Sequence, residues 1–577
     1  MDKRTGKQKM RAKWMLYTKK ADFEKIAREF HISPVTARIM RNRDVCGEEA
    51  IRRYLYGTKK DCYSPYLLKD VELAVDILQE KISKGKKIRI VGDYDIDGVC
   101  STYLLFKALN RVGAKVDYEI PDRIKDGYGI NVQMIEAAAA DGVDTILTCD
   151  NGISAVVELD RAKDLGMTVI ITDHHDIARK DDKDILPDVA AIINPKQQDC
   201  NYPWKEICGA VVAYKLIMVL YERFEVPRKE WEEMIEFAAI ATVGDVMKLQ
   251  DENRILVKEG LARMPETKSV GLRKLVEKNN LDIAHLTGFH IGFVIGPCLN
   301  AGGRLQTAKM ALRLLLSEDE EEADRLAQEL KLLNDQRKDM TSKGVEEAVK
   351  QVEKLYSNDK VLVVYLPECH ESLAGIIAGR IREQYHKPTM ILTKAEQGVK
   401  GSGRSIEAYH MFKALLEVKE LLTKFGGHPM AAGFSMPEEH VEQFRKKLNE
   451  NANLTPEDFI PQLWIDVAMP MEYVSEPLIH ELELLEPFGQ GNEKPQFAQK
   501  EIHIRNAKVL GRNRNAVKLS MATPEGTTID GIWFGEGDAF IEEMGTKQTI
   551  DVIYYPSINE YNGNRTLQMV IKEYQFH

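Results

Sequence analysis

Three aspartates stand at alternate positions in one short segment of the chain: Asp93, Asp95 and Asp97. The apolar run Ile88–Val91 before them predicts a buried strand, and the apolar stretch Val99–Val112 after them predicts a helix. Carboxylates crowded at one strand end repel one another and are costly to bury, and a divalent cation is the usual compensation. A surface turn rich in Asp and Gly is the alternative interpretation.

Further acids and histidines follow other predicted elements: Asp150, Asp173, His174, His175 and Asp245. The first follows the predicted strand Thr145–Cys149, the next three follow the predicted strand Val169–Thr172, and the last follows the apolar helix Phe237–Val243. Open α/β sheets bind ligands at the carboxyl ends of their strands, so we expect these side chains to converge. Carboxylates with one or two imidazoles suit Mn²⁺ or Mg²⁺, and the absence of nearby Cys ligands disfavours structural zinc.

The elements that must position these residues alternate between strand and helix from Lys86 to Asn194. This alternation predicts an α/β fold with a doubly wound, mainly parallel sheet. The predicted strands are Ile88–Val91, Val116–Ile120, Thr145–Cys149, Val169–Thr172 and Ala190–Ile193. Helices are predicted between them, for example over Val132–Ala140 and Ala155–Leu165.

The second half of the chain predicts a long linking helix and two further domains. The linking helix is expected to be broken or curved near Thr341–Gly344. A second α/β domain is expected from the strands Val361–Leu366 and Thr389–Leu392 and the helices Ser372–Gln384 and Met411–Leu422. Short β-type runs separated by Gly and Asn turns then predict a small barrel. These runs are Ile502–Val509, Ala516–Met521, Gly531–Phe534, Ile550–Tyr555 and Thr566–Ile571.

The order of the motifs resembles the DHH phosphoesterase superfamily and, within it, the RecJ family of single-strand-specific DNA exonucleases. The acidic and histidine motifs lie at 92–98, 149–152, 172–175 and 244–245. Further matching segments are 122–123, 127–129, 302–305, 401–405, 426–433 and 487–492. Many superfamily members have a His four residues before the first metal-binding Asp, where this chain has Val91. Asp93 is a candidate for the missing ligand.

The resemblance implies a site with two Mn²⁺ or Mg²⁺ ions. Asp150 would bridge the ions, Asp95 with Asp93 would hold one, and Asp97, His174 and Asp245 would hold the other. His175 would contact the phosphate or protonate the leaving oxygen, and Asp173 would orient a histidine from behind. Four basic residues would contact the substrate, the last two of them in Gly-rich turns: Arg123, Arg304, Arg404 and His428.

The activity implied by the resemblance is hydrolysis of single-stranded DNA by a two-metal mechanism, in repair and recombination. A 5′ to 3′ direction rests on the resemblance alone, because no spacing in the sequence encodes it. One alternative is a phosphoesterase for short oligonucleotides or nucleotide phosphates, which shares the metal site but has no need of the barrel. The other is a non-catalytic single-strand-binding scaffold, which would be expected to have lost metal ligands.

The expected organisation has five parts: a basic helical N-terminal segment (1–60), a DHH catalytic domain (61–315), a linking helix (316–358), a DHH-associated substrate-binding domain (359–455) and an OB-fold-like nucleic-acid-binding domain (456–577). Single strands bind OB-folds by stacking bases on aromatics beside basic residues. The candidates here are Trp533, Phe534, Tyr554, Tyr555, Arg512 and Arg514.

The composition indicates a folded protein with an uneven charge. Hydrophobic residues make up 44% of 577 residues and the net charge is −10, yet residues 1–60 carry 17 Lys and Arg against 7 Asp and Glu. This basic segment suggests an anionic partner, although a solvated helical surface explains it equally well. Within it, Ser33 and Pro34 predict the start of a helix.

The expected location is the cytoplasm. The N-terminus lacks an apolar signal core, and the longest apolar stretch, Cys208–Tyr221, is too short to span a bilayer. The eight cysteines form no C-x-x-C pair and are expected to be reduced thiols. Single-stranded DNA is the expected partner, and a single-strand DNA-binding protein is a second, by resemblance only. We expect a monomer with no membrane contact.

Overall fold

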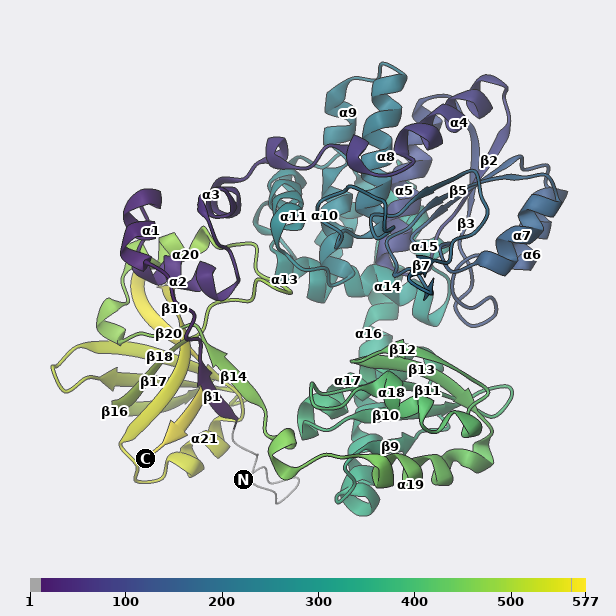
Figure 1. Ribbon diagram of the computed structural model, residues 1–577. Coiled ribbons are helices and arrows are strands. Elements are labelled where there is room, and N and C mark those ends of the chain that lie inside the picture. The colour runs from purple at the N-terminus through teal and green to yellow at the C-terminus, as the bar shows by residue number, and fades with distance from the viewer. Residues whose placement is uncertain (1–11, 562) are drawn as a thin grey trace. The chain divides into compact units, whose positions relative to one another are not determined.

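The computed structural model describes residues 12–561 and 563–577. Two compact units account for these residues, and Figure 1 labels their elements. The larger unit comprises residues 45–336 and 485–494, and the smaller unit comprises residues 12–44, 337–484 and 495–577. None of the helices in this described part of the chain combines the length and apolar character that a membrane span needs.

A five-stranded parallel sheet in the order β3-β2-β4-β5-β8 is the centre of the larger unit. Its strands are β2 (Lys87–Val91), β3 (Lys115–Glu119), β4 (Thr145–Cys149), β5 (Thr168–Thr172) and β8 (Ala191–Ile193). Buried side chains cover both faces, as a doubly wound sheet requires. Ile88 and Ile90 of β2 join one core and Val91 joins the other. The predicted strands and the predicted fold class are therefore confirmed.

Helices lie on both faces of this sheet. One core includes residues of α4 (Val71–Ser83), α5 (Ile96–Arg111), α8 (Gly209–Arg223) and α10 (Ile235–Gly244). The other includes residues of α6 (Val132–Ala140) and α7 (Val156–Asp164). The unit also contains α3 (Glu48–Tyr56), α9 (Arg228–Glu232), α11 (Asp251–Arg263), α12 (Val270–Lys278), α13 (Gly288–His290), α14 (Gly296–Leu305), α15 (Lys309–Leu316) and the short strands β6 (Arg179–Lys180) and β7 (Lys183–Asp184).

The predicted linking helix is α16 (Glu320–Gln351), which continues from one unit into the other. The helix was expected to be broken or curved near Thr341–Gly344; it is not broken there, because α16 runs through these residues, and a curve stays a prediction. Gly344 is instead a site of close packing. A Cβ there would lie 2.5 Å from Cδ1 of Ile377 on α17 (Ala374–Tyr385), so a larger residue would require this side chain to shift.

A five-stranded sheet in the order β12-β13-β11-β10-β9 forms one part of the smaller unit. Its elements are β9 (Leu362–Tyr365), β10 (Thr389–Lys394), β11 (Val399–Arg404), β12 (Lys424–His428), β13 (Ala431–Met436), α17, α18 (Met411–Leu416) and α19 (Val441–Asn451). The Gly-rich segments expected to be turns are strands β11 and β12, which is a correction. Glycine fits β11 because the ring of Phe434 covers Gly401, where a Cβ would lie 2.2 Å from the ring.

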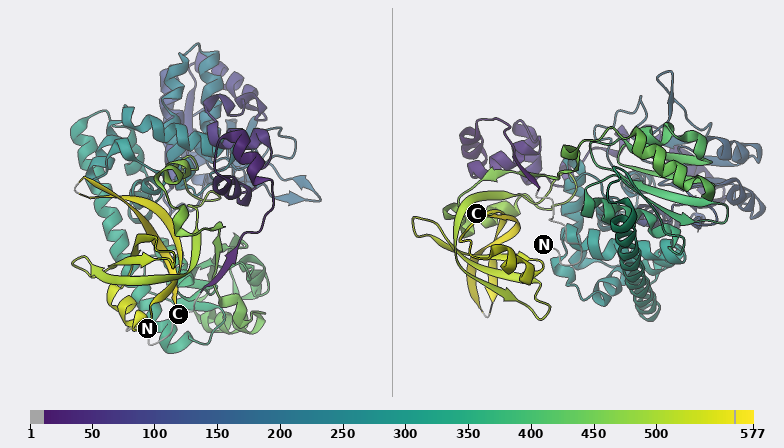
Figure 2. Two further views of the ribbon diagram at one scale, coloured as in Figure 1. Left: turned by 90° about the vertical axis from the view of Figure 1, so that its left-hand side faces the viewer. Right: turned by 90° about the horizontal axis from the view of Figure 1, so that it is seen from below.

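The C-terminal strands close into a barrel. The order is β15-β16-β17-β18-β20-β19, and a further pairing of β16 with β19 completes the ring. The elements are β15 (Val467–Ala468), β16 (Phe497–Leu510), β17 (Ala516–Ala522), β18 (Thr528–Phe534), α21 (Gly537–Met544), β19 (Thr549–Tyr561) and β20 (Asn564–Phe576). The curved yellow ribbons in Figure 2 are the last two strands. The predicted barrel is confirmed.

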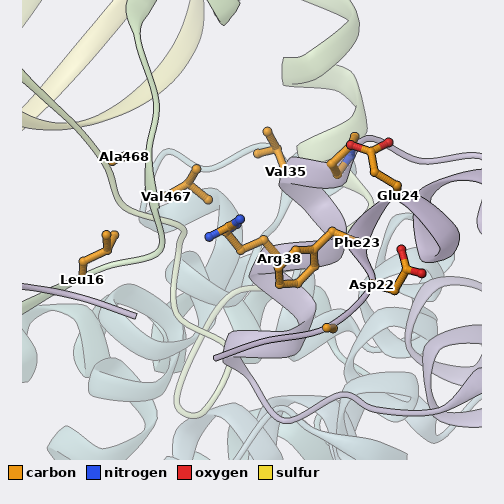
Figure 3. A pocket seen from close by; sticks show the side chains of 10 residues that line it. Leu16, Asp22, Phe23, Glu24, Val35, Arg38, Val467 and Ala468 are labelled. Atoms are coloured by element: carbon orange, nitrogen blue, oxygen red, sulfur yellow. The ribbon is translucent and has the colours of Figure 1, made fainter. Parts of the chain in front are cut away.

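The segment expected to be helical throughout contains a strand, β1 (Lys13–Leu16), that pairs in parallel with β14 (Gln462–Ile465). Residues 1–11 of that segment lie outside the described residues. Helices α1 (Phe23–Phe30) and α2 (Pro34–Asn42) follow, and Ser33 caps α2 as predicted. Helix α20 (Glu476–Glu483) is bonded to this cap, since Glu481 accepts hydrogen bonds from the Ser33 N–H and hydroxyl. A pocket of about 530 Å³ lies between α1, α2 and β15 (Figure 3).

Candidate metal centre

The loop between β2 and α5 places the first three aspartates. Asp95 caps α5, because its Oδ1 accepts hydrogen bonds from the N–H groups of Asp97 (3.0 Å) and Gly98 (3.1 Å). The helix therefore begins at Ile96 rather than at the predicted Val99. A Cβ at Gly98 would lie 2.4 Å from the carbonyl oxygen of Asp93, so glycine allows the loop to fold back onto the first helical turn. Asp93 and Asp97 are buried.

Asp150 lies at the end of β4 in a left-handed conformation, with φ of 60°. Its N–H donates to the carbonyl of Thr172 (3.0 Å), which fixes the turn after the strand. The start of α8 packs against it, because a Cβ at Gly209 would lie 2.8 Å from the Asp150 Cβ. The same helix start binds Asp97, whose two oxygens accept from the N–H groups of Gly209 (2.6 Å) and Ala210 (2.7 Å).

The His174 side chain points into the space between three carboxylates. Its Nε2 lies 3.1 Å from Asp150 Oδ1, 3.5 Å from Asp97 Oδ2 and 3.7 Å from Asp245 Oδ2. Asp245 follows α10 directly. Residues from β2, β4, β5 and α10 thus meet at the carboxyl edge of the sheet, where the sequence predicted convergence.

Two sets of three side chains can each hold a cation. The sets are Asp93, Asp95 and Asp150, and Asp97, His174 and Asp245; within each, the ligand atoms lie within 4.8 Å of one another. The structure therefore brings all six predicted metal ligands together. Asp150 also forms a ligand set with His174 and His175. Asp150 and His174 each belong to two of the three sets, and Asp150 has the two carboxylate oxygens that a ligand shared between ions would use.

The electrostatics of the cluster call for a cation. Burial, and then the charge of Asp95, raise the pKa of Asp93 to about 8. Burial and neighbouring aspartates also raise the pKa values of Asp150 and Asp245 well above their usual range. Oδ1 of Asp93 and Oδ1 of Asp150 are buried without a hydrogen bond. Burial lowers the pKa of His174, which favours the neutral imidazole that binds metals. These donors fit two divalent ions.

Asp173 holds His175 in place. Its Oδ1 lies 2.8 Å from His175 Nδ1 and accepts from the N–H of His174 (2.7 Å), while its Oδ2 accepts from the N–H of Ile153 (3.0 Å). Burial alone would lower the pKa of His175, but the hydrogen bond and charge of Asp173 raise it to about 9. Burial would raise the pKa of Asp173, but His175 lowers it to about 2. The pair is a carboxylate beside an imidazolium at neutral pH.

The sequence did not assign a role to Tyr128, although the segment 127–129 that contains it was part of the resemblance. Its hydroxyl donates to the carbonyl of Asp150 (3.1 Å) and lies 3.1 Å from His175 Nε2. Both neighbouring glycines have positive φ, 82° at Gly127 and 71° at Gly129, so this loop conformation requires them. The loop therefore brings a phenol to the histidine that Asp173 orients.

Comparison with known proteins places this geometry in a family. Three family models match the chain: the DHH family N-terminal domain over residues 87–243, the DHHA1 domain over 358–453 and the RecJ OB domain over 465–573. The chain is 37% identical to the single-stranded-DNA-specific exonuclease RecJ of Bacillus subtilis over 95% of this chain and 69% of that protein. It is 34% identical to that of Escherichia coli over 94% and 95%. The chain belongs to the RecJ family.

Solved structures agree with this membership. The crystal structure of Thermus thermophilus RecJ in complex with Mn²⁺ superposes with a TM-score of 0.82 and 29% identity over 98% of this chain and 80% of that chain. Its complex with Mg²⁺ gives a TM-score of 0.78 and 28% identity over 98% and 78%. RecJ relatives thus include a protein solved with each of the two ions expected here.

Two of the four predicted substrate residues adjoin the metal centre. The Arg123 guanidinium lies 4.7 Å from the centroid of the Tyr94 ring. Tyr94 is the residue between Asp93 and Asp95 in the sequence. Burial raises the pKa of Tyr94 to about 12, and the charges of Arg123 and Arg304 oppose this rise. Helix α14 reaches the same loop, since a Cβ at Gly303 would lie 2.4 Å from the Tyr94 carbonyl.

The other two predicted substrate residues belong to the smaller unit, at the ends of strands. Arg404 ends β11 and donates from Nη1 to the Gly403 carbonyl (2.8 Å) and to Ser402 Oγ (3.3 Å). His428 ends β12 and is exposed. Their contact with a substrate stays a prediction.

The barrel aromatics divide into surface and core residues. Phe534 is 66% exposed and stays a candidate for base stacking in the RecJ OB domain. Tyr554 is 1% exposed and donates to the Met469 carbonyl (2.8 Å), so its expected role in stacking is wrong. Trp533 packs edge-on against Tyr574, and Arg514 forms an ion pair with Asp538. Arg512 is exposed and Tyr555 is half-buried.

Proposed function

We propose that this chain is a metal-dependent exonuclease that hydrolyses single-stranded DNA from its 5′ end, in DNA repair and recombination. The observation that carries the proposal is the pair of ligand sets that meet beside Asp150 at the sheet edge. Membership of the RecJ family, whose curated members are named single-stranded-DNA-specific exonucleases, supports the substrate.

Six side chains would hold two Mn²⁺ or Mg²⁺ ions: Asp93, Asp95, Asp97, Asp150, His174 and Asp245. Asp150 would be shared, and Asp93 would act where other superfamily members use a histidine. When bound, such ions lower the pKa of water and stabilise charge on phosphoryl oxygens. Binding would also require the raised carboxyl pKa values to fall, because the ligands must be deprotonated.

His175 would supply the proton for the leaving oxygen. With a pKa of about 9, its imidazole is protonated at neutral pH. Asp173 occupies Nδ1, so the proton on Nε2, beside the Tyr128 hydroxyl, is the one available to the substrate. Tyr128 would keep the ring aimed at the site, and Asp173 would stabilise the charged ring before the transfer.

The substrate would be held through its phosphates. Arg123 and Arg304 lie at the loop that carries the aspartates, so they would bind the phosphates nearest the ions. Arg404, His428 and the OB domain are the further candidates for contact with the strand. Such contacts make affinity dependent on salt and independent of base sequence.

The proposal is tested with three substrates: a long single strand labelled at its 5′ end, the same strand labelled at its 3′ end, and a blunt duplex. Each substrate is incubated with the protein once with Mn²⁺ and once with a chelator. Immediate release of the 5′ label as a mononucleotide, only with metal and only from the single strand, is the expected result. First release of the 3′ label would contradict the direction. Cleavage limited to oligonucleotides of a few residues would instead show a small-substrate phosphoesterase.

We further propose that the chain works as a monomer in the cytoplasm and contacts a single-strand DNA-binding protein. The eight free cysteines, five of them buried, support a reducing compartment. The partner is supported by the resemblance alone. Sedimentation of the chain with and without such a protein tests both the monomer and the contact.

A further inference from the structure

Two phenylalanines in the larger unit are exposed side by side. Phe289 is 61% exposed and Phe293 is 68% exposed, and their rings stack with centroids 4.8 Å apart at an interplanar angle of 24°. Large exposed aromatic pairs are costly in water, and in monomeric proteins they mark interaction surfaces more often than chance. The pair is therefore a candidate binding surface.

The backbone beneath the pair is unusual. Phe289 belongs to α13, and Phe293 belongs to a π-helical segment, Ile291–Ile295, that continues directly into α14. A π-helical turn is rare and occurs often at functional sites. Here it contains Phe293 and begins two residues after Phe289, and the two rings stack on each other.

The same segment packs against the elements of the metal centre. A Cβ at Gly292 would lie 3.5 Å from Cγ1 of Val243, which is two residues before Asp245. A Cβ at Gly296 would lie 3.2 Å from Cδ1 of Ile96, which stands between Asp95 and Asp97. The segment that carries Phe293 thus contacts the end of α10, and the first residue of α14, which follows it, contacts the start of α5.

A third exposed apolar side chain directly follows the predicted metal ligand Asp245 in the chain. This residue, Val246, is 65% exposed and has a φ of 58°. A β-branched residue rarely adopts this left-handed conformation, and such strain is typical of functional sites. We call these three exposed side chains, Val246, Phe289 and Phe293, the apolar step.

We propose that the apolar step is a base-stacking platform, on which nucleobases of single-stranded DNA rest beside the metal centre. The inference rests on the proposed function. Aromatic rings stack on every base and so hold a strand without reading its sequence, which suits an exonuclease that must advance through any sequence. Phosphate contacts from Arg123 and Arg304 would then be complemented by contacts to bases.

The test compares two 20-nucleotide strands, oligothymidylate and a strand of abasic residues, in anisotropy titrations with a chelator so that nothing is cut. Phe289→Ala/Phe293→Ala should reduce the preference for the base-containing strand by about tenfold or more. Phe289→Leu/Phe293→Leu, which keeps apolar area but not the ring, should also lose most of that preference. Leu73→Ala, which truncates a 47% exposed side chain on α4, is the matched control and should leave it unchanged.

An unchanged preference in both double variants would overturn the platform. So would a change in thermal unfolding or in oligomeric state without a change in the preference, because the step would then be a packing or protein-docking surface. Wild-type protein that does not cut oligothymidylate with Mn²⁺ would refute the proposed function instead. The two failures are therefore distinguishable.

Discussion

Two clusters of charge are buried in the larger unit, and they are built differently. In the first, Lys215 Nζ lies 2.5 Å from Glu252 Oε1, and both side chains are almost fully buried. The Tyr202 hydroxyl bonds the same carboxylate, the Tyr63 N–H donates to it (2.9 Å), and Lys215 also donates to the Tyr63 carbonyl (2.6 Å). Every charge in this cluster has a partner of opposite charge or a hydrogen bond.

The second cluster is the metal centre, where several carboxyl groups are buried beside one another. Asp93, Asp97 and Asp150 are each at most 2% exposed, and no Lys or Arg forms an ion pair with any of them among the ion pairs of the described residues. The comparison teaches that burial of charge alone does not identify a site. A cluster that neutralises itself stabilises the fold, whereas a cluster that lacks its counter-charge is a site for a cation.

The largest effect is expected from Asp150→Asn. The change removes the charge shared between ligand sets, so turnover should fall by about 10³-fold or more, beyond the 10- to 100-fold typical of a residue that only supports a ligand. Unfolding in chelator should occur at the same temperature or higher, because a repelling charge is lost. The measurements are initial rates with Mn²⁺ and thermal unfolding. Asp160→Asn, at an exposed acid of α7, is the control.

The opposite pattern is expected from Lys215→Met. It leaves Glu252 as a buried charge without its ion-pair partner, which should lower the free energy of unfolding by about 3–5 kcal/mol. Activity per folded molecule should persist, since none of the predicted ligands contacts Lys215. Denaturant unfolding measures the change, with Lys84→Met of the exposed Lys84–Glu80 pair as a nearly neutral control. Equal stability of the Lys215 variant and wild type would remove the basis of the comparison.

The metal centre should also make the stability of the metal-free protein depend on pH. The folded pKa of Asp93, about 8, lies above its ordinary value of 3.8, so the metal-free native state binds more protons than the unfolded state. This contribution to stability is complete below pH 4 and is lost as pH rises towards 8. In chelator, Asp93→Asn should therefore flatten the fall in stability between pH 5 and pH 8. Mn²⁺ should bind more tightly at the higher pH, because protons no longer compete.

The smallest effect is expected from Tyr128→Phe. It removes the hydroxyl that bonds the Asp150 carbonyl and lies beside His175, so turnover should fall about three- to tenfold. Steady-state rates measure the loss, and Tyr66→Phe, whose hydroxyl bonds Glu222 on the surface, is the control. No loss in the Tyr128 variant would show that Asp173 alone suffices to orient His175.

The sequence predicted that these acidic and His side chains converge, because its signals are local. Each candidate ligand lies close to the end of a short apolar run, and the ends of parallel strands share an edge, so Asp150 and His174 could be brought together without a structure. The strands of the larger unit were likewise predicted from short apolar runs. Whether Asp93 is a ligand stays a prediction, since the sequence only offered it in place of a missing histidine.

What the sequence did not reveal depends on distant contacts. Strand β1 pairs with β14, which is more than 400 residues away in the chain. The glycines of β11 indicate a turn, but the ring of Phe434 covers Gly401 and the side chain of Met411 covers Gly403. Tyr554 has the composition of a stacking residue but lies in the barrel core. In each case the neighbour that decides the structure comes from another part of the chain.

The most direct test of the metal centre is the number of Mn²⁺ ions that the wild-type chain binds at pH 8, measured by equilibrium dialysis. Two ions per chain, reduced by Asp150→Asn and unaffected by Lys215→Met, is the predicted result. Binding of one ion or none by the wild type, or equal binding by the Asp150 variant, would contradict the assignment of the cluster as a two-ion site.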